Sequence, residues 1–234
     1  MAQRFLEVAG VQGWYGESHV LHGVDFHVEE GEVVTLLGRN GAGRTSTLRA
    51  IMGLIGARTG SIKVKGTETV GMPTYRIARL GLGYCPEERG IFSSLSTEEN
   101  LMLPPELGKT GMSVEQIYAM FPNLKERASS QGTRLSGGEQ QMLAVARILR
   151  TGARLLLLDE ISEGLAPVIV QQLGMVVKSL RAQGYTIVMV EQNFRFAAPL
   201  ADRFLVMEHG QVIQQFSQAE LPARMERLHE YLGV

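Results

Sequence analysis

The sequence predicts an α/β fold built around a phosphate-binding loop, and three observations support this prediction. The apolar run 32–37 is followed by a glycine-rich loop and then by helical spacing, the order that a phosphate-binding loop requires. The runs 155–158 and 186–190 are continuously apolar, which is typical of strands with helices on both faces of a sheet. Residues from about 88 to 150 have a helical pattern and are interpreted as a helical subdomain inserted between core strands.

Length and composition fit one domain over residues 1–234, with 44% hydrophobic residues to build its core. The formal net charge is −1 and no lysine or arginine cluster stands out, so a nucleic-acid partner is not indicated. The single cysteine, Cys85, excludes an internal disulfide and fits a reducing compartment. No apolar run approaches the ~20 residues needed to cross a bilayer, and the N-terminal residues lack a signal-peptide pattern. We therefore expect a soluble, cytosolic protein whose membrane role would depend on a partner.

The individual elements follow from the periodicity of apolar side chains. Residues 3–30 alternate apolar and polar side chains, which indicates antiparallel strands with a tight turn near Glu30 and Gly31. The helix expected within 45–55 has an apolar face made of Leu48, Ile51, Met52 and Ile55. The remaining expected elements are a strand at 82–85, a helix capped by Ser96 and Glu99, a hairpin over 204–216 that turns at His209 and Gly210, and a last helix near the capping box of Ser217 and Glu220.

The glycine-rich loop, LLGRNGAGRTS over 36–46, departs from the pattern G-x-x-x-x-G-K-[ST] at one position, where Arg44 replaces lysine. Gly38, Gly41 and Gly43 would let backbone N–H groups converge on an anion at a helix N-terminus. Thr45 would offer its hydroxyl group to Mg²⁺. Without the lysine, a plain strand-to-helix turn explains this loop alone equally well.

A second motif, LLLLDE over 155–160, ends an apolar strand with two carboxylates. Asp159 could hold hydrated Mg²⁺, and Glu160 could align and polarise an attacking water. The alternative is an acidic cap at the start of a helix, which is common. Because Thr45, Asp159 and Glu160 are all present, and because Arg44 keeps a charge that can donate several hydrogen bonds to phosphate oxygens, we expect a working site rather than a decayed one.

The third motif, LSGGEQQ over 135–141, is the most specific of the three. A serine and two glycines open a helix, which exposes backbone N–H groups and a hydroxyl group at its positive end. An ordinary helix cap would need Ser136 but not both Gly137 and Gly138. We therefore interpret this motif as a phosphate-binding helix start.

These three motifs, in this order and spacing, resemble the ATP-binding-cassette (ABC) ATPases over essentially the whole chain. The resemblance implies that Tyr15 stacks on adenine, although a surface strand tyrosine is the alternative. It implies that Glu87 lies in the loop joining the core to the helical subdomain, where many relatives carry glutamine. It also implies that Gln192 faces the γ-phosphate, where many relatives carry histidine.

The resemblance assigns roles to a wider set of residues. Catalysis is assigned to Glu160, Gln192 and Arg44, and Mg²⁺ to Thr45, Asp159 and Glu87. ATP would also contact Gly38, Arg39, Asn40, Gly41, Ala42, Gly43, Arg44, Thr45 and Ser46. The signature residues Ser136, Gly137, Gly138 and Glu139 would act on a nucleotide held by a partner ATPase.

Further motifs, PEER, IFSSLSTEENL, DEISEGLAP, VEQN and a terminal YLGV, are similar to one branch of this family. That branch comprises the ATPase subunits of importers for branched-chain and other hydrophobic amino acids, with close relatives that handle urea or short amides. The resemblance implies three partners: membrane-spanning permease subunits, a second ATPase subunit that is either another copy of this chain or a different chain, and, indirectly, a solute-binding protein. It implies a peripheral position on the cytoplasmic face of the cell membrane. Arg44 and Ile161 depart from the commoner lysine and proline, which bears on the hydrolysis rate.

Two other functions remain to be weighed. A soluble ATPase of DNA repair or translation would need a long coiled-coil insertion or two cassettes, and neither fits in 234 residues. A regulatory ABC subunit with little hydrolysis is supported by Arg44 and opposed by Glu160. The pair His19 and His22 lies in a strand-like stretch without a nearby cysteine, so we interpret it as surface or core histidines rather than a metal site.

Overall fold

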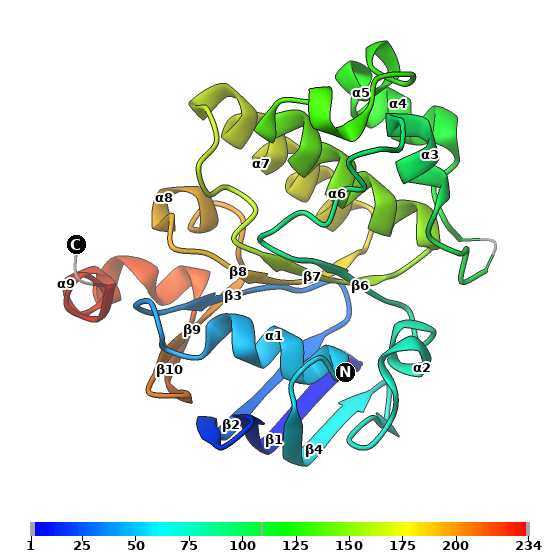
Figure 1. The fold of residues 1–234 in the computed structure, drawn as a ribbon. Helices are drawn as coiled ribbons and strands as arrows, with labels where there is room; N and C mark the ends of the chain where they lie inside the picture. Colours follow the sequence, from blue (N-terminus) through cyan, green and yellow to red (C-terminus); the bar gives the residue numbers. More distant parts are fainter. Residues whose placement is uncertain (1–2, 109, 233–234) are drawn as a thin grey trace.

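The computed structural model describes residues 3–108 and 110–232, and it has two β-sheets with helices between and above them (Figure 1). The larger sheet has the strand order β10-β9-β3-β8-β7-β6. Its strands are parallel except β10, which is antiparallel to β9. Their bounds are β3 (Val33–Leu37), β6 (Leu82–Cys85), β7 (Leu155–Asp159), β8 (Thr186–Val190), β9 (Arg203–Glu208) and β10 (Gln211–Ser217). The predicted strands and the hairpin turn at His209 and Gly210 are confirmed.

The smaller sheet is antiparallel, with the order β2-β1-β4-β5. It contains β1 (Arg4–Tyr15), β2 (Ser18–Glu29), β4 (Ala57–Val64) and β5 (Thr67–Glu68). The predicted N-terminal antiparallel strands are confirmed, but the position of their turn is corrected. The hairpin turns at residues 16–17, because Gly16 adopts a φ of 56°. The turn at Glu30 and Gly31 instead leads from β2 into β3 of the other sheet.

Helices cover both faces of the larger sheet (Figure 1). On one face, α1 (Arg44–Met52) lies between the two sheets, and α2 (Thr74–Ala78) lies near the end of β6. On the other face lie α6 (Gly137–Thr151), α7 (Pro167–Ala182) and the short α8 (Phe194–Ala197). Alternate residues of β7 enter different cores: Leu156 and Leu158 pack with α6 and α7, whereas Leu155 and Leu157 face α1. This burial on both sides explains why the strand is apolar throughout.

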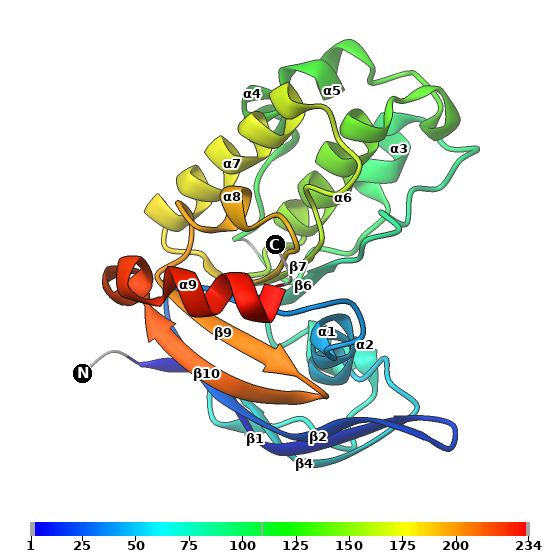
Figure 2. The same cartoon turned by 90° about the vertical axis from the view of Figure 1, so that its left-hand side faces the viewer.

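The segment from about 88 to 150 is helical, as predicted. It contains α3 (Thr97–Met102), α4 (Val114–Met120), α5 (Pro122–Glu126), a short 3₁₀ turn, η1 (Gly132–Arg134), and most of α6. Ser96 and Glu99 form the predicted capping box of α3. At the other end of the chain, η2 (Gln218–Glu220) and α9 (Leu221–Leu232) pack on β9 and β10 (Figure 2). Among the described residues, no helix has the length and apolar character needed to span a membrane.

The strand order determines where chemistry can occur. β3, β8 and β7 are neighbours in the sheet and run parallel, so their carboxyl ends lie at one edge. The glycine loop follows β3, Asp159 ends β7, and Glu191 follows β8. Residues more than 100 positions apart in the sequence therefore meet at this edge, which is the usual place for ligands in open α/β sheets.

Candidate nucleotide site

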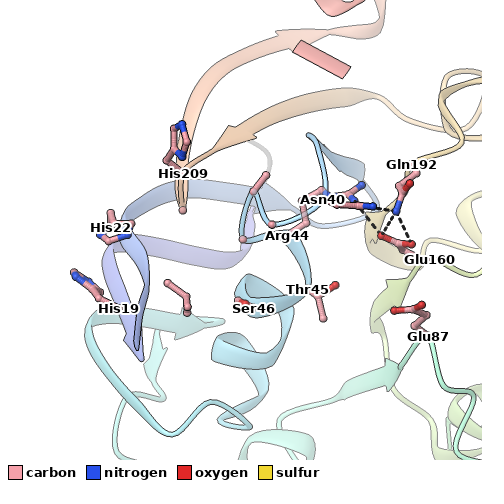
Figure 3. Close-up of a pocket in the computed structure, with 15 residues that line it drawn as sticks. His19, His22, Asn40, Arg44, Thr45, Ser46, Glu87, Glu160, Gln192 and His209 are labelled. Atoms are coloured by element: carbon pink, nitrogen blue, oxygen red, sulfur yellow. Dashed lines mark hydrogen bonds and ion pairs between the residues drawn. The ribbon is translucent and has the colours of Figure 1, made fainter. Parts of the chain in front are cut away.

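A pocket of about 610 Å³ opens at this edge of the sheet (Figure 3). Its polar wall comes from the glycine loop together with residues that follow β6, β7 and β8. Its other wall comes from the start of β2 and from the turn between β9 and β10. The described residues that line it are His19, Val20, His22, Asn40, Gly41, Ala42, Gly43, Arg44, Thr45, Ser46, Glu87, Glu160, Gln192, His209 and Gly210.

The glycines of the loop are required by its backbone path. Gly38 has a φ of 153°, and a Cβ atom there would lie 2.4 Å from the carbonyl oxygen of Met207. Gly41 and Gly43 have φ values of 80° and 99°, which residues other than glycine rarely adopt. Gly43 is the N-cap of α1, and no side chain caps the first N–H groups of that helix. Free N–H groups and the helix dipole favour an anion at this point.

Arg44, at the lysine position of the loop, is buried with 5% of its surface exposed. Its Nη2 forms an ion pair with Glu160 Oε1 at 3.0 Å, and its Nη1 donates to the carbonyl oxygen of Glu191 at 2.9 Å. Burial lowers the pKa of Arg44, and Glu160 is the strongest of the carboxylates that oppose this effect. The sequence predicts contacts between Arg44 and phosphate; in this structure its guanidinium is instead bound to the carboxylate expected to activate water.

Gln192 and Asn40 complete a network around Glu160 (Figure 3). Gln192 Nε2 donates to Asn40 Oδ1 at 2.6 Å and lies 3.3 and 3.2 Å from the two carboxylate oxygens of Glu160. Asn40 Oδ1 also accepts from Arg44 Nη2 at 3.4 Å. Glu160 has a φ of 47°, a left-handed conformation that non-glycine residues rarely adopt. The structure therefore brings together all three residues for which the sequence predicts a catalytic role.

Asp159 and Thr45 form an oxygen-rich pair at the foot of the loop. Thr45 Oγ1 donates to Asp159 Oδ1 at 2.9 Å, and the hydroxyl group of Tyr84 donates to Oδ2 at 2.9 Å. Burial raises the pKa of Asp159, and these two hydrogen bonds partly offset that effect. Glu87 lines the same pocket. Oxygen donors from a hydroxyl group and carboxylates suit Mg²⁺, which usually keeps several of its own waters.

Histidine side chains line the far end of the pocket. The ring of His19 stacks on Trp14, with centroids 4.4 Å apart and planes 10° from parallel, and packs against His22. Tyr15, predicted to stack on adenine, is 37% exposed and is not among the described residues that line the pocket. Side-chain hydrogen bonds with Tyr84 and, to a smaller extent, with Tyr15 raise the pKa of Arg49. The structure thus places histidines, rather than the predicted tyrosine, beside the cavity.

The signature residues 136–139 lie outside the described lining of this pocket. Ser136 caps α6 and forms a capping box with Glu139. A Cβ atom at Gly138 would lie 2.9 Å from the side chain of Ile169 on α7, so packing requires glycine there. A Cβ atom at Gly137 would lie 3.2 Å from Nη1 at the end of the Arg89 side chain, whose Nε donates to Gln141 Oε1 at 3.2 Å. Packing against α7 therefore requires the second glycine, whereas a side chain in place of the first would meet no backbone atom among its nearest neighbours.

Glu191 and Ser162 lie near the site, and the sequence predicts no role for either of them. Glu191 is 1% exposed, and its carboxylate accepts hydrogen bonds from the backbone N–H and the hydroxyl group of Ser162, at 3.1 and 2.7 Å. Burial raises the pKa of Glu191 to about 7. A sequence signal was available, because an acidic residue directly follows an all-apolar strand. Its buried partner, however, is 29 residues away and could not be identified without the fold.

A strand, a glycine loop and a helix start, beside an acidic strand end, define a phosphate-loop nucleotide-binding protein. The profile of the family described as ABC transporter matches residues 21–163, more than half of the chain. This chain therefore belongs to the ABC transporter family, as an ATP-binding subunit with ATPase activity.

The relatives and solved structures agree with this assignment. The chain is 41% identical to BraG of Pseudomonas aeruginosa, a high-affinity branched-chain amino acid transport ATP-binding protein, over 95% of this chain and 97% of BraG. It is 30% identical to the lipopolysaccharide export system ATP-binding protein LptB of Escherichia coli K12, over 94% of this chain and 93% of LptB. Among solved structures, an ATP-binding subunit of an ABC transporter has a TM-score of 0.82 at 26% identity, covering 98% of this chain and 100% of its own. A nucleotide-free cassette has a TM-score of 0.84 at 21% identity, covering 99% of each chain, and shows the shared fold.

Proposed function

We propose that this chain powers an importer for branched-chain or other hydrophobic amino acids. The observation that carries the proposal is the 41% identity to BraG along nearly the full length of both proteins. The similarity to LptB, an export-system protein, is lower at 30%. Urea or a short amide is the other class of solute, by resemblance of the motifs. The solute itself would be selected by the partners, because the pocket of this chain is lined for a nucleotide.

In the proposed reaction, the N–H groups at the start of α1 bind the phosphates of ATP. Thr45, Asp159 and Glu87 would hold Mg²⁺, which supplies charge stabilisation to the transferred phosphoryl group when bound. Glu160 would accept a proton from the attacking water. Gln192 contacts both carboxylate oxygens of Glu160 and would orient that carboxylate. Arg44 would have to leave Glu160, or share it, for both groups to act on the nucleotide.

The position of the signature residues supports a partner ATPase. Ser136 and Gly137 lie at the start of a helix but outside the pocket of their own chain, so a nucleotide bound elsewhere would receive them. We therefore propose a dimer of ATPase subunits, in which each phosphate loop faces the signature helix of the other. Membrane-spanning permease subunits, and indirectly a solute-binding protein, would complete the importer, with this chain on the cytoplasmic face.

Turnover and transport measurements test this function. ATP hydrolysis by the purified chain would be measured alone and with its membrane subunits, in parallel with uptake of leucine, urea and acetamide by the reconstituted complex. We expect hydrolysis to rise in the complex and only hydrophobic amino acids to be imported. Uptake of urea or acetamide alone would move the chain to the other solute class. Absence of hydrolysis in the complex would support a regulatory subunit.

The base of ATP can be located with the single tryptophan of the chain. Because Trp14 stacks on His19 and His19 lines the pocket, we expect ATP to change the fluorescence of Trp14. His19→Ala should remove most of this change and weaken ATP binding by a few-fold, while Tyr15→Ala should have the smaller effect. A larger loss of affinity from Tyr15→Ala than from His19→Ala, measured by calorimetry, would identify Tyr15 as the stacking residue.

Arg44 should contribute to ATP binding despite its ion pair. Arg44→Ala removes a charged hydrogen-bond donor beside the phosphate loop, and we expect ATP affinity to fall by about 1.5–3 kcal/mol. Arg44→Lys keeps the positive charge beside the phosphates and should be tolerated, although lysine cannot make both contacts of the guanidinium, one with the Glu191 carbonyl oxygen and one with the Glu160 carboxylate. Equal ATP affinity of the alanine variant and the wild type would show that the guanidinium stays on Glu160 in the bound state.

A further inference from the structure

Glu191 occupies an unusual position for a carboxylate. It directly follows β8, is 1% exposed, and lies among groups at the edge of the nucleotide pocket without lining it. Moving a carboxylate out of water is costly unless hydrogen bonds compensate. Ser162 supplies two such bonds, from its backbone N–H at 3.1 Å and from its hydroxyl group at 2.7 Å. The carboxylate therefore joins the loop after β8 to the loop after β7.

The same residue is connected to three groups around the γ-phosphate position. Its carbonyl oxygen accepts from Arg44 Nη1 at 2.9 Å. Its C-terminal neighbour is Gln192, which contacts Glu160. Its partner Ser162 lies two residues after Glu160. A displacement of Glu191 would therefore move the guanidinium, the amide and the carboxylate relative to one another.

We propose that Glu191 is a positioning residue, which sets Arg44 and Gln192 around Glu160 through its bonds to Ser162. This proposal rests on ATP hydrolysis at the site and is independent of the transported solute. Glu191 does not line the pocket, so it acts through its neighbours. Small errors in the position of a catalytic group reduce turnover more than they reduce substrate binding.

The charge state of Glu191 gives the proposal a signature. Its pKa of about 7 results mainly from burial, while the bonds from Ser162 act in the opposite direction. The charged groups that face it are Glu160, which raises its pKa, and Arg44, whose own pKa it helps to raise. Protonation weakens acceptance of the two Ser162 bonds, so we expect kcat to fall as the pH decreases through about 7.

The test compares Glu191→Gln with the full-length wild-type chain, measuring ATP turnover from pH 5.5 to 8.5. In Glu191→Gln we expect kcat at pH 8 to fall about tenfold, with KM for ATP changed less than twofold. The fall of kcat below about pH 7, expected for the wild type, should be absent from the pH profile of this variant. Ser162→Ala should lower kcat in the same direction, and Ser162→Thr, which keeps the hydroxyl group, should recover it. The double variant should lose no more than Glu191→Gln alone, because both changes break the same link.

A structural role alone would have a different pH dependence. The pKa of Glu191 in the folded protein lies above its ordinary value of 4.5. The wild type therefore gains stability over Glu191→Gln below pH 4.5, and this advantage is lost as the pH rises through 7. Stability would thus fall over the range in which turnover is expected to rise, so denaturant unfolding separates the two effects.

Glu32→Gln is the matched control, because Glu32 also accepts a backbone N–H and pairs with Arg203, but lies at the opposite end of β3. It should lower stability and leave kcat and its pH profile unchanged. An equal loss of kcat in this control, an unchanged kcat in Glu191→Gln, or an effect confined to KM would overturn the proposal. A wild-type chain without any ATP turnover would instead contradict the ATPase function itself.

Discussion

Replacement of Glu160 by glutamine should reduce ATP hydrolysis by about 10²–10⁴-fold while ATP remains bound. Glutamine has nearly the same size and keeps one oxygen that can accept the hydrogen bond from Arg44 Nη2, now at 3.0 Å. It cannot accept a proton from water, so only the chemical step loses its base. The rare backbone conformation at this position, with a φ of 47°, is as available to glutamine as to glutamate.

Turnover and nucleotide affinity should be measured together on the purified chain. ATP that is bound and not hydrolysed should hold two ATPase subunits together, which gel filtration can detect. Glu163→Gln provides a control, because that carboxylate is an exposed neighbour in the same loop. Turnover of Glu160→Gln equal to that of the wild type would refute the assignment of Glu160 as the base.

Gly137→Asp should slow total hydrolysis of the assembled transporter more than Arg44→Ala does. If the second ATPase subunit carries the usual lysine and histidine, the two sites are unequal, and the signature helix of this chain serves the faster one. The new carboxylate would face a phosphate across the dimer, where like charges repel strongly. The carboxylate would also attract the guanidinium of Arg89 away from Gln141, because a Cβ atom at this position would lie 3.2 Å from Nη1 of Arg89.

The structure makes Gly137 the better of the two glycines for this experiment. A side chain at Gly138 would collide with Ile169 and disturb packing, whereas the nearest atoms to a Cβ at Gly137 belong to the guanidinium end of Arg89, at 3.2 Å. Gly137→Asn is the matched control, since it has the size of aspartate without its charge. Assembly of each complex must be checked first. Equal losses from Gly137→Asp and Arg44→Ala would favour two equivalent sites, and a greater loss from Arg44→Ala would reject the asymmetry.

The order of local elements could be predicted from the sequence because it depends on neighbouring residues. The strand at 186–190, the capping box of Ser96 and Glu99 and the hairpin turn at His209 and Gly210 all follow from periodicity and turn chemistry. The phosphate loop is local in part: the positive φ values of Gly41 and Gly43 belong to the path of the loop itself, whereas Gly38 also avoids the carbonyl oxygen of Met207 on β9. The misplaced hairpin turn shows the limit: two glycine turns, at 16–17 and at 30–31, flank one strand, and only pairing between strands reveals which of them closes the hairpin.

The fold class and the family could be predicted from the sequence, because contiguous motifs carry both. The same motifs supply the candidate residues of the nucleotide site, which remain a prediction. The pairing of those residues depends on the packing of distant segments and could not be predicted. The ion pair of Arg44 with Glu160 joins positions 116 residues apart, and the link from Glu191 to Ser162 exists only because β7 and β8 are adjacent in the sheet. The approach of β2 to the hairpin of β9 and β10 likewise brings His19, for which the sequence predicts no role in the site, to the pocket. Hydrogen bonds and ion pairs act over a few ångströms, so their partners are chosen by the packing of distant segments and leave no signal in either segment alone.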